Sequence, residues 1–286
     1  MPIVEIKSLL TGTRGTSLPF SDYSEFLGND CLHFQDILDQ IIDYGRKAGW
    51  KYIEIRGPMN LPADIPYSSY YYGHTLELSP NEADTFKLFR DSTKRNIQKG
   101  MKSGLEVRIC NSVESVKQFY RLHCMTRKRH GLPPQPSYFF NNIFQHIIAN
   151  NQGFVVLASY NKEVIAGAVF FHFGKTAIFK YGASKLRYHY LRPNNLVMWE
   201  AIRWCCQNGY SIFCFGRTAP ENKGLLQFKS GWGTKQQILR YYKYDLNKEV
   251  YINNHYEIGD FSHKLFNKMP VPVLRMIGTL LYKHMG

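Results

Sequence analysis

Three short apolar runs follow one another between residues 153 and 182 and constrain the fold of this chain more than any other feature. They cover residues 153–160, 164–173 and 176–182. Their close spacing predicts an antiparallel meander of three strands. A helical pattern at about 194–208 and an apolar run at 211–215 come next, which indicates a crossover into another strand. We therefore expect an α+β fold with a mixed, largely antiparallel sheet.

The first part of the chain shows the same alternation of strands and helices in a shorter form. Its predicted elements are strands at 4–10, 51–56, 67–78 and 105–110 and helices at 31–48 and 80–103. Two more helices are predicted at 113–129 and 137–150. We expect residues 1–110 to form a partial first half, residues 111–250 a second half, and residues 251–286 a C-terminal helical tail.

The formal net charge of +14 indicates an anionic partner, which is a nucleic acid, a nucleotide-linked substrate or an acidic membrane surface. Six cysteines, from Cys31 to Cys214, show no CxxC spacing and no clustered histidine, so no metal site is expected. Several lie in apolar runs, which is typical of buried free thiols in a reducing compartment. Since no signal segment or membrane-spanning run is present, we expect a cytoplasmic protein, either free or bound peripherally at the inner face of the membrane.

Residues 215–236 link two predicted strands and carry the richest set of candidate functional side chains. The segment holds four glycines, the cations Arg217 and Lys229 close to aromatic residues, and Trp232 between two of the glycines. Glycine lets the backbone approach a ligand closely, and a fixed cation can bind a phosphate, a carboxylate or a developing oxyanion. We predict a functional loop here. A long hairpin connection with solvated charges is the alternative.

The predicted helix at 80–103 carries six cations, which suit a polyphosphate or an RNA backbone. Arg90 and Lys94 share a face at helical spacing, and Arg95 lies near the apolar side. A solvated basic face is the alternative interpretation.

A second anion site is predicted at residues 184–196. Pro193 near a helix start, with Asn194 and Asn195 as capping residues, would leave backbone N–H groups free for a pyrophosphate. Arg187 and Arg192 lie beside this helix start. An ordinary capped helix with surface arginines explains the pattern equally well.

Two further features have plain structural interpretations. His123 falls on a predicted helix, where a lone histidine is more often structural than a general base. The stretch at 265–285 mixes Leu, Met and Ile with Lys268, Arg275 and Lys283. Such a segment can lie on an acidic membrane surface, but we prefer a C-terminal helix packed on the body.

Four groups of residues occur along the chain in a recognisable order. They are Arg90-x-Ser92-Thr93-x-Arg95-Asn96-Ile97 with Gly104, Thr126-x-x-x-His130-Gly131-Leu132-Pro133, Tyr181-x-Ala183-Ser184 with Leu191-x-Pro193-Asn194-x-Leu196-x-x-Trp199, and Phe215-Gly216-Arg217-Thr218 with Gly224-Leu225-x-x-Phe228-Lys229-x-x-Trp232-Gly233. Together, over roughly residues 15–245, they resemble the Fem-type branch of the GNAT acyltransferases. This branch includes the peptidoglycan-bridge aminoacyltransferases and related proteins found with exopolysaccharide-export systems.

The resemblance implies two GNAT-like halves with an acceptor groove between them, the first half lacking its beginning. It also implies transfer of an acyl or aminoacyl group to an amine of a cell-envelope or polysaccharide precursor. Phe228 and Lys229 match a pair associated with acyl transfer, and the Lys229 ammonium would stabilise the oxyanion. The candidates for binding substrate or phosphate are Arg217, Arg95, Arg90, Lys94, Arg192, Asn194, Asn195, Tyr181 and Trp232.

The resemblance leaves the donor open between an acyl-CoA and an aminoacyl-tRNA. Residues 191–195 stand where an acyl-CoA GNAT carries a glycine-rich loop, and this difference and the basic charge favour tRNA. The absence of a helical-hairpin insertion, which some relatives use to contact tRNA, favours CoA. A second hypothesis from another class is a catalytically silent binding protein that holds a nucleic acid or a nucleotide-linked ligand on the same fold.

Overall fold

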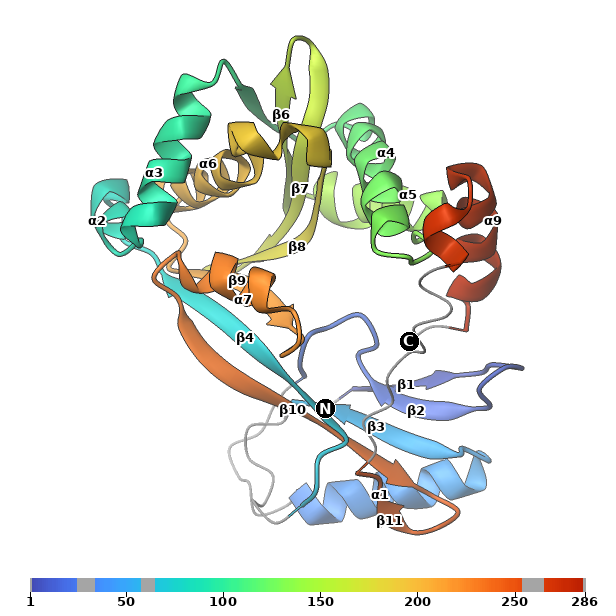
Figure 1. Cartoon of the computed structure of the whole chain (residues 1–286). Helices are drawn as coiled ribbons and strands as arrows, with labels where there is room; N and C mark the ends of the chain where they lie inside the picture. The colour runs from blue at the N-terminus through green and yellow to red at the C-terminus, as the bar shows by residue number, and fades with distance from the viewer. Residues whose placement is uncertain (1, 25–33, 58–64, 254–264, 285–286) are drawn as a thin grey trace.

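The computed structural model describes residues 2–24, 34–57, 65–253 and 265–284 (Figure 1). Cys31 and the predicted start of the first helix lie outside these residues. The helices are α1 (Phe34–Lys47), α2 (Glu82–Lys87), α3 (Asp91–Lys102), α4 (Val113–Arg129), α5 (Ser137–Ile143), the π-helical turn η2 (Phe144–Ile148), the 3₁₀ segment η3 (Leu186–Leu191), α6 (Pro193–Gln207), α7 (Lys223–Ser230) and α9 (Val271–Tyr282). The strands are β1 (Ile3–Ile6), β2 (Arg14–Ser17), β3 (Tyr52–Arg56), β4 (Ser69–Glu77), β5 (Glu106–Cys110), β6 (Gly153–Tyr160), β7 (Glu163–Phe173), β8 (Thr176–Ser184), β9 (Ile212–Thr218), β10 (Lys235–Asp245) and β11 (Val250–Tyr251).

One continuous sheet joins the two parts of the molecule, in the order β1-β2-β3-β10-β4-β9-β8-β7-β6-β5. Neighbouring strands are antiparallel except for the pairs β2–β3 and β8–β9, which are parallel. The predicted mixed, largely antiparallel sheet is therefore confirmed, as is the crossover through α6 from β8 to β9. The long strands β4 and β10 run from one part to the other (Figure 1). Because β10 pairs with β3 and β4, the sheet crosses the predicted boundary between residues 110 and 111.

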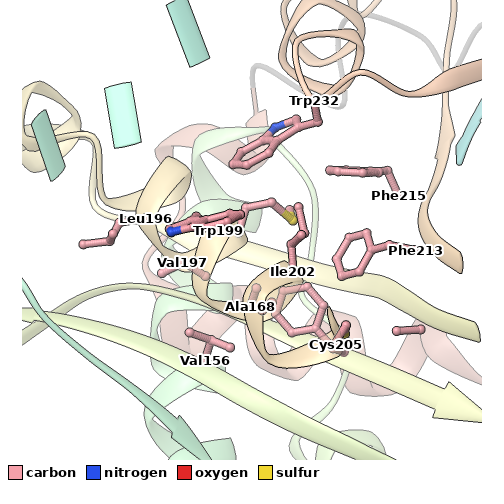
Figure 2. Close-up of a cluster of buried hydrophobic side chains, with 14 of the residues drawn as sticks. Val156, Ala168, Leu196, Val197, Trp199, Ile202, Cys205, Phe213, Phe215 and Trp232 are labelled. Atoms are coloured by element: carbon pink, nitrogen blue, oxygen red, sulfur yellow. The ribbon is translucent and has the colours of Figure 1, made fainter. Parts of the chain in front are cut away.

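The meander β6–β8 is covered on both faces by helices, which explains why β6 is apolar along almost its whole length. Val155 and Leu157 point to the α4 side, and Val156 points to the α6 side. Figure 2 shows the α6 side, where Trp199 and Ile202 pack toward Val156 of β6 and toward the rings that β9 contributes. Complete burial of each large apolar side chain contributes about 1.5–3 kcal/mol, so this core holds α6 firmly against β8 and β9.

The predicted helix at 80–103 is two helices, α2 and α3, with a break between them. The backbone of Arg90 is extended there (φ −61°, ψ 144°), and its N–H donates to the carbonyl of Gly231 (3.0 Å). Gly233 has φ +70°, and a Cβ on it would lie 2.6 Å from the carbonyl oxygen of Leu88. The turn around Trp232 therefore packs directly on the break. Local helical periodicity carried no signal for this contact between distant parts of the chain.

Candidate functional site

The candidate site lies where β8 and β9 separate. These strands pair in parallel only over Thr176–Ile178 and Ile212–Cys214, although both strands continue beyond this stretch. A loop at residues 18–24, which follows β2, reaches both strands beyond that point. The Lys180 ammonium of β8 donates to the carbonyl of Phe20 (2.6 Å), and the backbone N–H of Arg217 on β9 donates to the Asp22 carboxylate (3.3 Å). The first part of the chain therefore supplies one wall of the site.

Arg217 is a fixed, partly exposed cation at this position. Its guanidinium lies over the rings of Tyr71 (4.4 Å) and Tyr241 (5.1 Å), donates to the Tyr241 hydroxyl (2.5 Å) and lies 3.8 Å from Asp22. Burial lowers its pKa, but Tyr241, Tyr71 and Asp22 more than offset this, so the pKa is raised overall. The side chain is still 34% exposed, so the group can bind an anion that enters from solvent.

Lys229 is the last but one residue of α7, and its side chain is almost completely buried, with 2% exposed. Its ammonium donates to the carbonyls of Gly216 (2.9 Å) and Arg217 (3.0 Å) on β9. Burial lowers the pKa of Lys229 from 10.5 to about 8, against the opposing effect of Asp22. An ammonium group has three N–H donors, so these two bonds leave one N–H for another acceptor.

We call Asp22, Lys180, Arg217, Lys229 and Tyr241 the Asp22 cluster. Tyr241 closes it by donating from its hydroxyl to the backbone carbonyl of Asp22 (2.5 Å). Three cations face one carboxylate, which leaves a local excess of positive charge. Such an excess suits an anionic substrate or a developing oxyanion better than a neutral ligand.

His74 of β4 lies beside this cluster and keeps its imidazole fully buried. Neither ring nitrogen has a hydrogen-bond partner of good geometry. Burial lowers the pKa of His74, and the nearby Lys229 lowers it further. His74 is therefore neutral at pH 7 and leaves the charge of the cluster unchanged.

Three members of the cluster were missed by the sequence analysis: Asp22, Lys180 and Tyr241. Asp22 stands in a turn between Phe20 and Tyr23, and its partner Arg217 is 195 residues away in the sequence. Gly216, with φ +68°, has the Asp22 carboxylate 2.8 Å from the position of a Cβ, so a side chain at 216 would displace the carboxylate. The sequence shows a carboxylate in a turn and the glycine of the Phe-Gly-Arg motif, but nothing local connects the two.

The prediction of a glycine-rich loop at 215–236 was wrong in two respects. The segment contains helix α7, whose N-terminus is capped by Asn222 accepting from the Leu225 N–H (3.1 Å). The glycines that flank Trp232 approach the backbone and side chains of the α2–α3 break instead of a ligand.

Trp232 itself is completely buried between Phe89 and Phe215, so it belongs to the core (Figure 2). Phe228 is half-buried and packs against Trp232.

Tyr181 of β8 lies beyond the pairing with β9 but points into the aromatic cluster of α4 and α5. Its ring contacts Phe139, Phe140 and His123. Burial raises the pKa of Tyr181 above its usual range, with Asp22 adding to the effect. His123 accepts or donates a 2.6 Å hydrogen bond with Gln135, and burial lowers its pKa to about 4. His123 is therefore a neutral core residue, as predicted.

The cations of the predicted basic helix lie apart from the Asp22 cluster. Arg90 is exposed and donates to the carbonyl of Gln227 (3.3 Å), while the Lys94 ammonium donates to the carbonyl of Lys87 (3.0 Å). Arg95 is exposed on the side of α3 that faces away from α6. The side chains of Arg90 and Lys94 are thus hydrogen-bonded to backbone carbonyls around the α2–α3 break. Arg95 remains available to a partner.

The start of α6 fits a pyrophosphate poorly. Arg192, in the left-handed conformation (φ +60°), stands at the N-cap where Asn194 was expected. Pro193 has no N–H, and the N–H of Asn195 donates to the Arg192 carbonyl (3.1 Å). In the first turn, therefore, at most the backbone N–H of Asn194 is free to bind an anion. The Asn194 side chain donates to the Ser184 hydroxyl (3.2 Å).

Arg187, which was predicted to lie beside this helix start, is paired with a carboxylate. Its guanidinium binds both carboxylate oxygens of Glu163 (2.7 and 2.8 Å), and Lys185 binds the same carboxylate (2.5 Å). Arg192 is exposed, as is Arg187, but Arg187 is paired with Glu163. Among the described residues, no group of three or more His, Cys, Asp or Glu side chains is placed to hold a metal ion.

The parallel strands β8 and β9, which separate beyond their pairing, and the crossover helix α6 between them form the frame of this site. The model of the acetyltransferase (GNAT) domain family matches residues 87–230, which is half of the chain. The chain therefore belongs to the acetyltransferase (GNAT) domain family. The relatives below include a Fem-family transferase and the structure of FemX, which agrees with the resemblance of the motifs.

Among curated proteins, the chain is similar to UDP-N-acetylmuramoylpentapeptide-lysine N(6)-alanyltransferase of Weissella viridescens, with 22% identity over 143 residues. That match covers 50% of this chain and 42% of the relative, so it spans less than half of the relative's length. Among solved structures, FemX has a TM-score of 0.60 at 14% identity and 83% coverage of both chains. The C-terminal domain of a putative lysylphosphatidylglycerol synthetase from Agrobacterium fabrum has a TM-score of 0.57 at 14% identity, covering 92% of this chain and 82% of that one.

Proposed function

We propose that the chain transfers an aminoacyl group from an aminoacyl-tRNA to a primary amine of a nucleotide-linked cell-envelope or polysaccharide precursor. The observation that carries the proposal is the buried Lys229 ammonium, held on the carbonyls of Gly216 and Arg217 beside a partly exposed Arg217. The relative from Weissella viridescens is by name an alanyltransferase that acts on a lysine of a UDP-linked peptide, which supports this choice of acceptor. Both substrates are cytoplasmic molecules, and the buried free thiols Cys205 and Cys206 suit that compartment.

In the proposed reaction, the acceptor amine attacks the carbonyl carbon of the aminoacyl ester. A C–N bond forms, the C–O bond to the tRNA ribose breaks, and the proton lost by the amine leaves with the ribose hydroxyl. The carbonyl oxygen becomes an oxyanion in the tetrahedral intermediate, and the remaining N–H of Lys229 stabilises it. One positioned donor of this kind typically contributes a factor of about 10²–10³ in rate. With a pKa of about 8, Lys229 is mostly protonated at pH 7 and can act as this donor.

Arg217 is the proposed site for the diphosphate of the precursor. Its planar guanidinium can bind two phosphate oxygens at once, and the rings of Tyr71 and Tyr241 hold it in place. Asp22 fixes the backbone of Arg217 through the Arg217 N–H, so it is a positioning residue. In this proposal the phosphates bind beside β9, the strand whose carbonyls also accept from Lys229.

The proposed choice of tRNA over CoA rests on two observations. The start of α6 offers too few free amides for a pyrophosphate. The outer side of α3 exposes Arg95, Lys99 and Lys102, and none of the three forms an ion pair within the described residues. They are spaced at i, i+4 and i+7, so they share one face of α3 and suit an RNA backbone.

A non-catalytic binding protein is the second candidate, and one observation favours it. Lys229 is nearly inaccessible and already has two backbone acceptors, which is also how a purely structural lysine is held. This reading predicts binding of the precursor without turnover.

The test is a transfer assay with a UDP-linked peptide precursor as acceptor and two labelled donors, alanyl-tRNA and acetyl-CoA, in parallel. The proposal expects an alkali-stable amide product from alanyl-tRNA and none from acetyl-CoA. Product from acetyl-CoA alone would overturn the donor assignment. Binding of the precursor with no product from either donor would establish the second candidate.

A further inference from the structure

The C-terminal helix α9 packs on the body through only one of its sides. Leu274 is completely buried, and a Cβ on Gly278 would lie 2.1 Å from the carbonyl oxygen of Pro134, so the helix and the loop are in direct contact. Figure 1 shows α9 beside α4 and α5, at the edge of the molecule farthest from α2 and α3. The predicted packing of this segment is confirmed for residues 265–284.

The side of α9 turned away from Leu274 and Gly278 presents apolar side chains to solvent, and Met276 also borders a hollow that Tyr120 and Ser137 line. Val273, Met276 and Leu280 are 38%, 60% and 62% exposed. Their spacing of three and four residues places them in one row along the helix. We call these three residues the α9 row. Neighbouring exposed apolar side chains of this kind form a contiguous patch, and contiguous exposed apolar patches mark interaction sites.

The charges around the α9 row are all positive. From residue 261 to residue 286 the sequence contains no Asp or Glu. Lys268 and Lys283 are exposed, and neither has an ion pair within the described part of the chain. Lys283 follows Met276 by seven residues and therefore lies on the same side of the helix. Arg275, by contrast, lies over the ring of Tyr120 (5.4 Å) and serves the fold.

We propose that the α9 row and its flanking lysines dock this chain on an anionic phospholipid bilayer, with α9 lying in the plane of the interface. The apolar row would enter the headgroup and acyl boundary, and the lysines would bind the anionic headgroups. A second copy of the chain fits this surface less well, because a symmetric contact would bring like charges together without a carboxylate to pair them. No helix among the described residues is long and apolar enough to cross a membrane. The proposal is independent of the transfer chemistry.

The docked helix would lie next to the Asp22 cluster. The ring of Tyr282, at the end of α9, stacks on Phe20 at 5.6 Å. The Phe20 carbonyl in turn accepts from Lys180 of the cluster (2.6 Å). Membrane contact through α9 would therefore bring the candidate site close to the lipid surface.

The test is sedimentation of the full chain with vesicles of phosphatidylcholine alone or with 30% phosphatidylglycerol. We expect binding to the anionic vesicles only, weakened by added salt. Met276→Glu with Leu280→Glu should abolish sedimentation, whereas the matched pair Phe173→Glu with Ile238→Glu, which changes two exposed apolar residues elsewhere, should leave it unchanged. Lys268→Ser with Lys283→Ser, which changes only exposed side chains, should weaken binding about 30-fold, since each lysine near an anionic surface contributes about fivefold.

Three results would overturn the proposal. These are equal binding to neutral and anionic vesicles, wild-type binding by the Met276→Glu/Leu280→Glu variant, or no binding by the wild-type chain. A wild-type dimer in solution that the Met276→Glu/Leu280→Glu variant loses, together with absent vesicle binding, would assign the surface to self-association instead. The thermal midpoints of all variants verify that each one folds.

Discussion

Replacing Lys229 by methionine separates a catalytic role from a structural one. The pKa of Lys229 falls from 10.5 to about 8 in the folded chain, so at neutral pH its buried charge lowers the free energy of unfolding by about 3 kcal/mol. Methionine removes this cost, but it leaves the carbonyls of Gly216 and Arg217 without their donor, at about 1–3 kcal/mol each. These effects have opposite signs, so the free energy of unfolding should change by less than about 3 kcal/mol. The chain should remain folded.

The same substitution removes the proposed oxyanion donor and should lower kcat about 10²–10³-fold with little change in KM. The measurements are urea unfolding for stability and steady-state transfer for kcat and KM. Lys235→Met is the matched control, because Lys235 is an exposed lysine that pairs with Glu77 on the surface, and both values should stay near wild type. A Lys229→Met chain that folds and turns over at the wild-type rate would refute the assigned role. A fall in kcat that only accompanies unfolding would assign Lys229 to the fold alone.

Three further predictions follow from the same site. As pH rises, deprotonation of the acceptor amine should raise kcat, but above about pH 8 Lys229 loses its own proton and kcat should level off. In Lys229→Arg the guanidinium stays charged, so kcat should continue to rise with pH. A wild-type pH profile that does not level off near pH 8 would contradict the pKa of Lys229. Arg217→Lys should raise the KM for the precursor about tenfold, since an ammonium cannot bind two phosphate oxygens in the plane between the tyrosines; an unchanged KM would move the phosphates elsewhere. Arg95→Ser/Lys99→Ser/Lys102→Ser should weaken tRNA binding and reduce its salt dependence by about two to three in log–log slope, while precursor binding stays constant; an unchanged slope would remove tRNA from α3.

Much of the second half could be predicted because its signals are local. The meander β6–β8 and the helix α4 follow from periodicity within single segments, and the bounds of α4 agree with the predicted range. Arg217 and Lys229 were both predicted from one short stretch, and in the structure the Lys229 ammonium lies 3.0 Å from the backbone carbonyl oxygen of Arg217. Whether both act in catalysis stays a prediction.

What the sequence concealed depends on contacts between distant segments. The break between α2 and α3 exists because the Trp232 turn packs there, and helical periodicity over 80–103 gives no sign of it. Asp22 reaches Arg217 only because β10 joins the first part of the sheet to the second. Asn194 looked like a cap, but Arg192 takes the N-cap in a left-handed conformation that sequence alone does not indicate for arginine.

The most direct test of the central claim is a crystal structure with a tetrahedral phosphonamidate analogue that joins the precursor amine to an aminoacyl-adenosine mimic. The account predicts that the oxygen standing for the oxyanion lies within hydrogen-bond distance of the Lys229 ammonium, with the precursor diphosphate on Arg217. An analogue that binds with this oxygen facing solvent or another donor, and with Lys229 still bound only to the carbonyls of Gly216 and Arg217, would contradict the account.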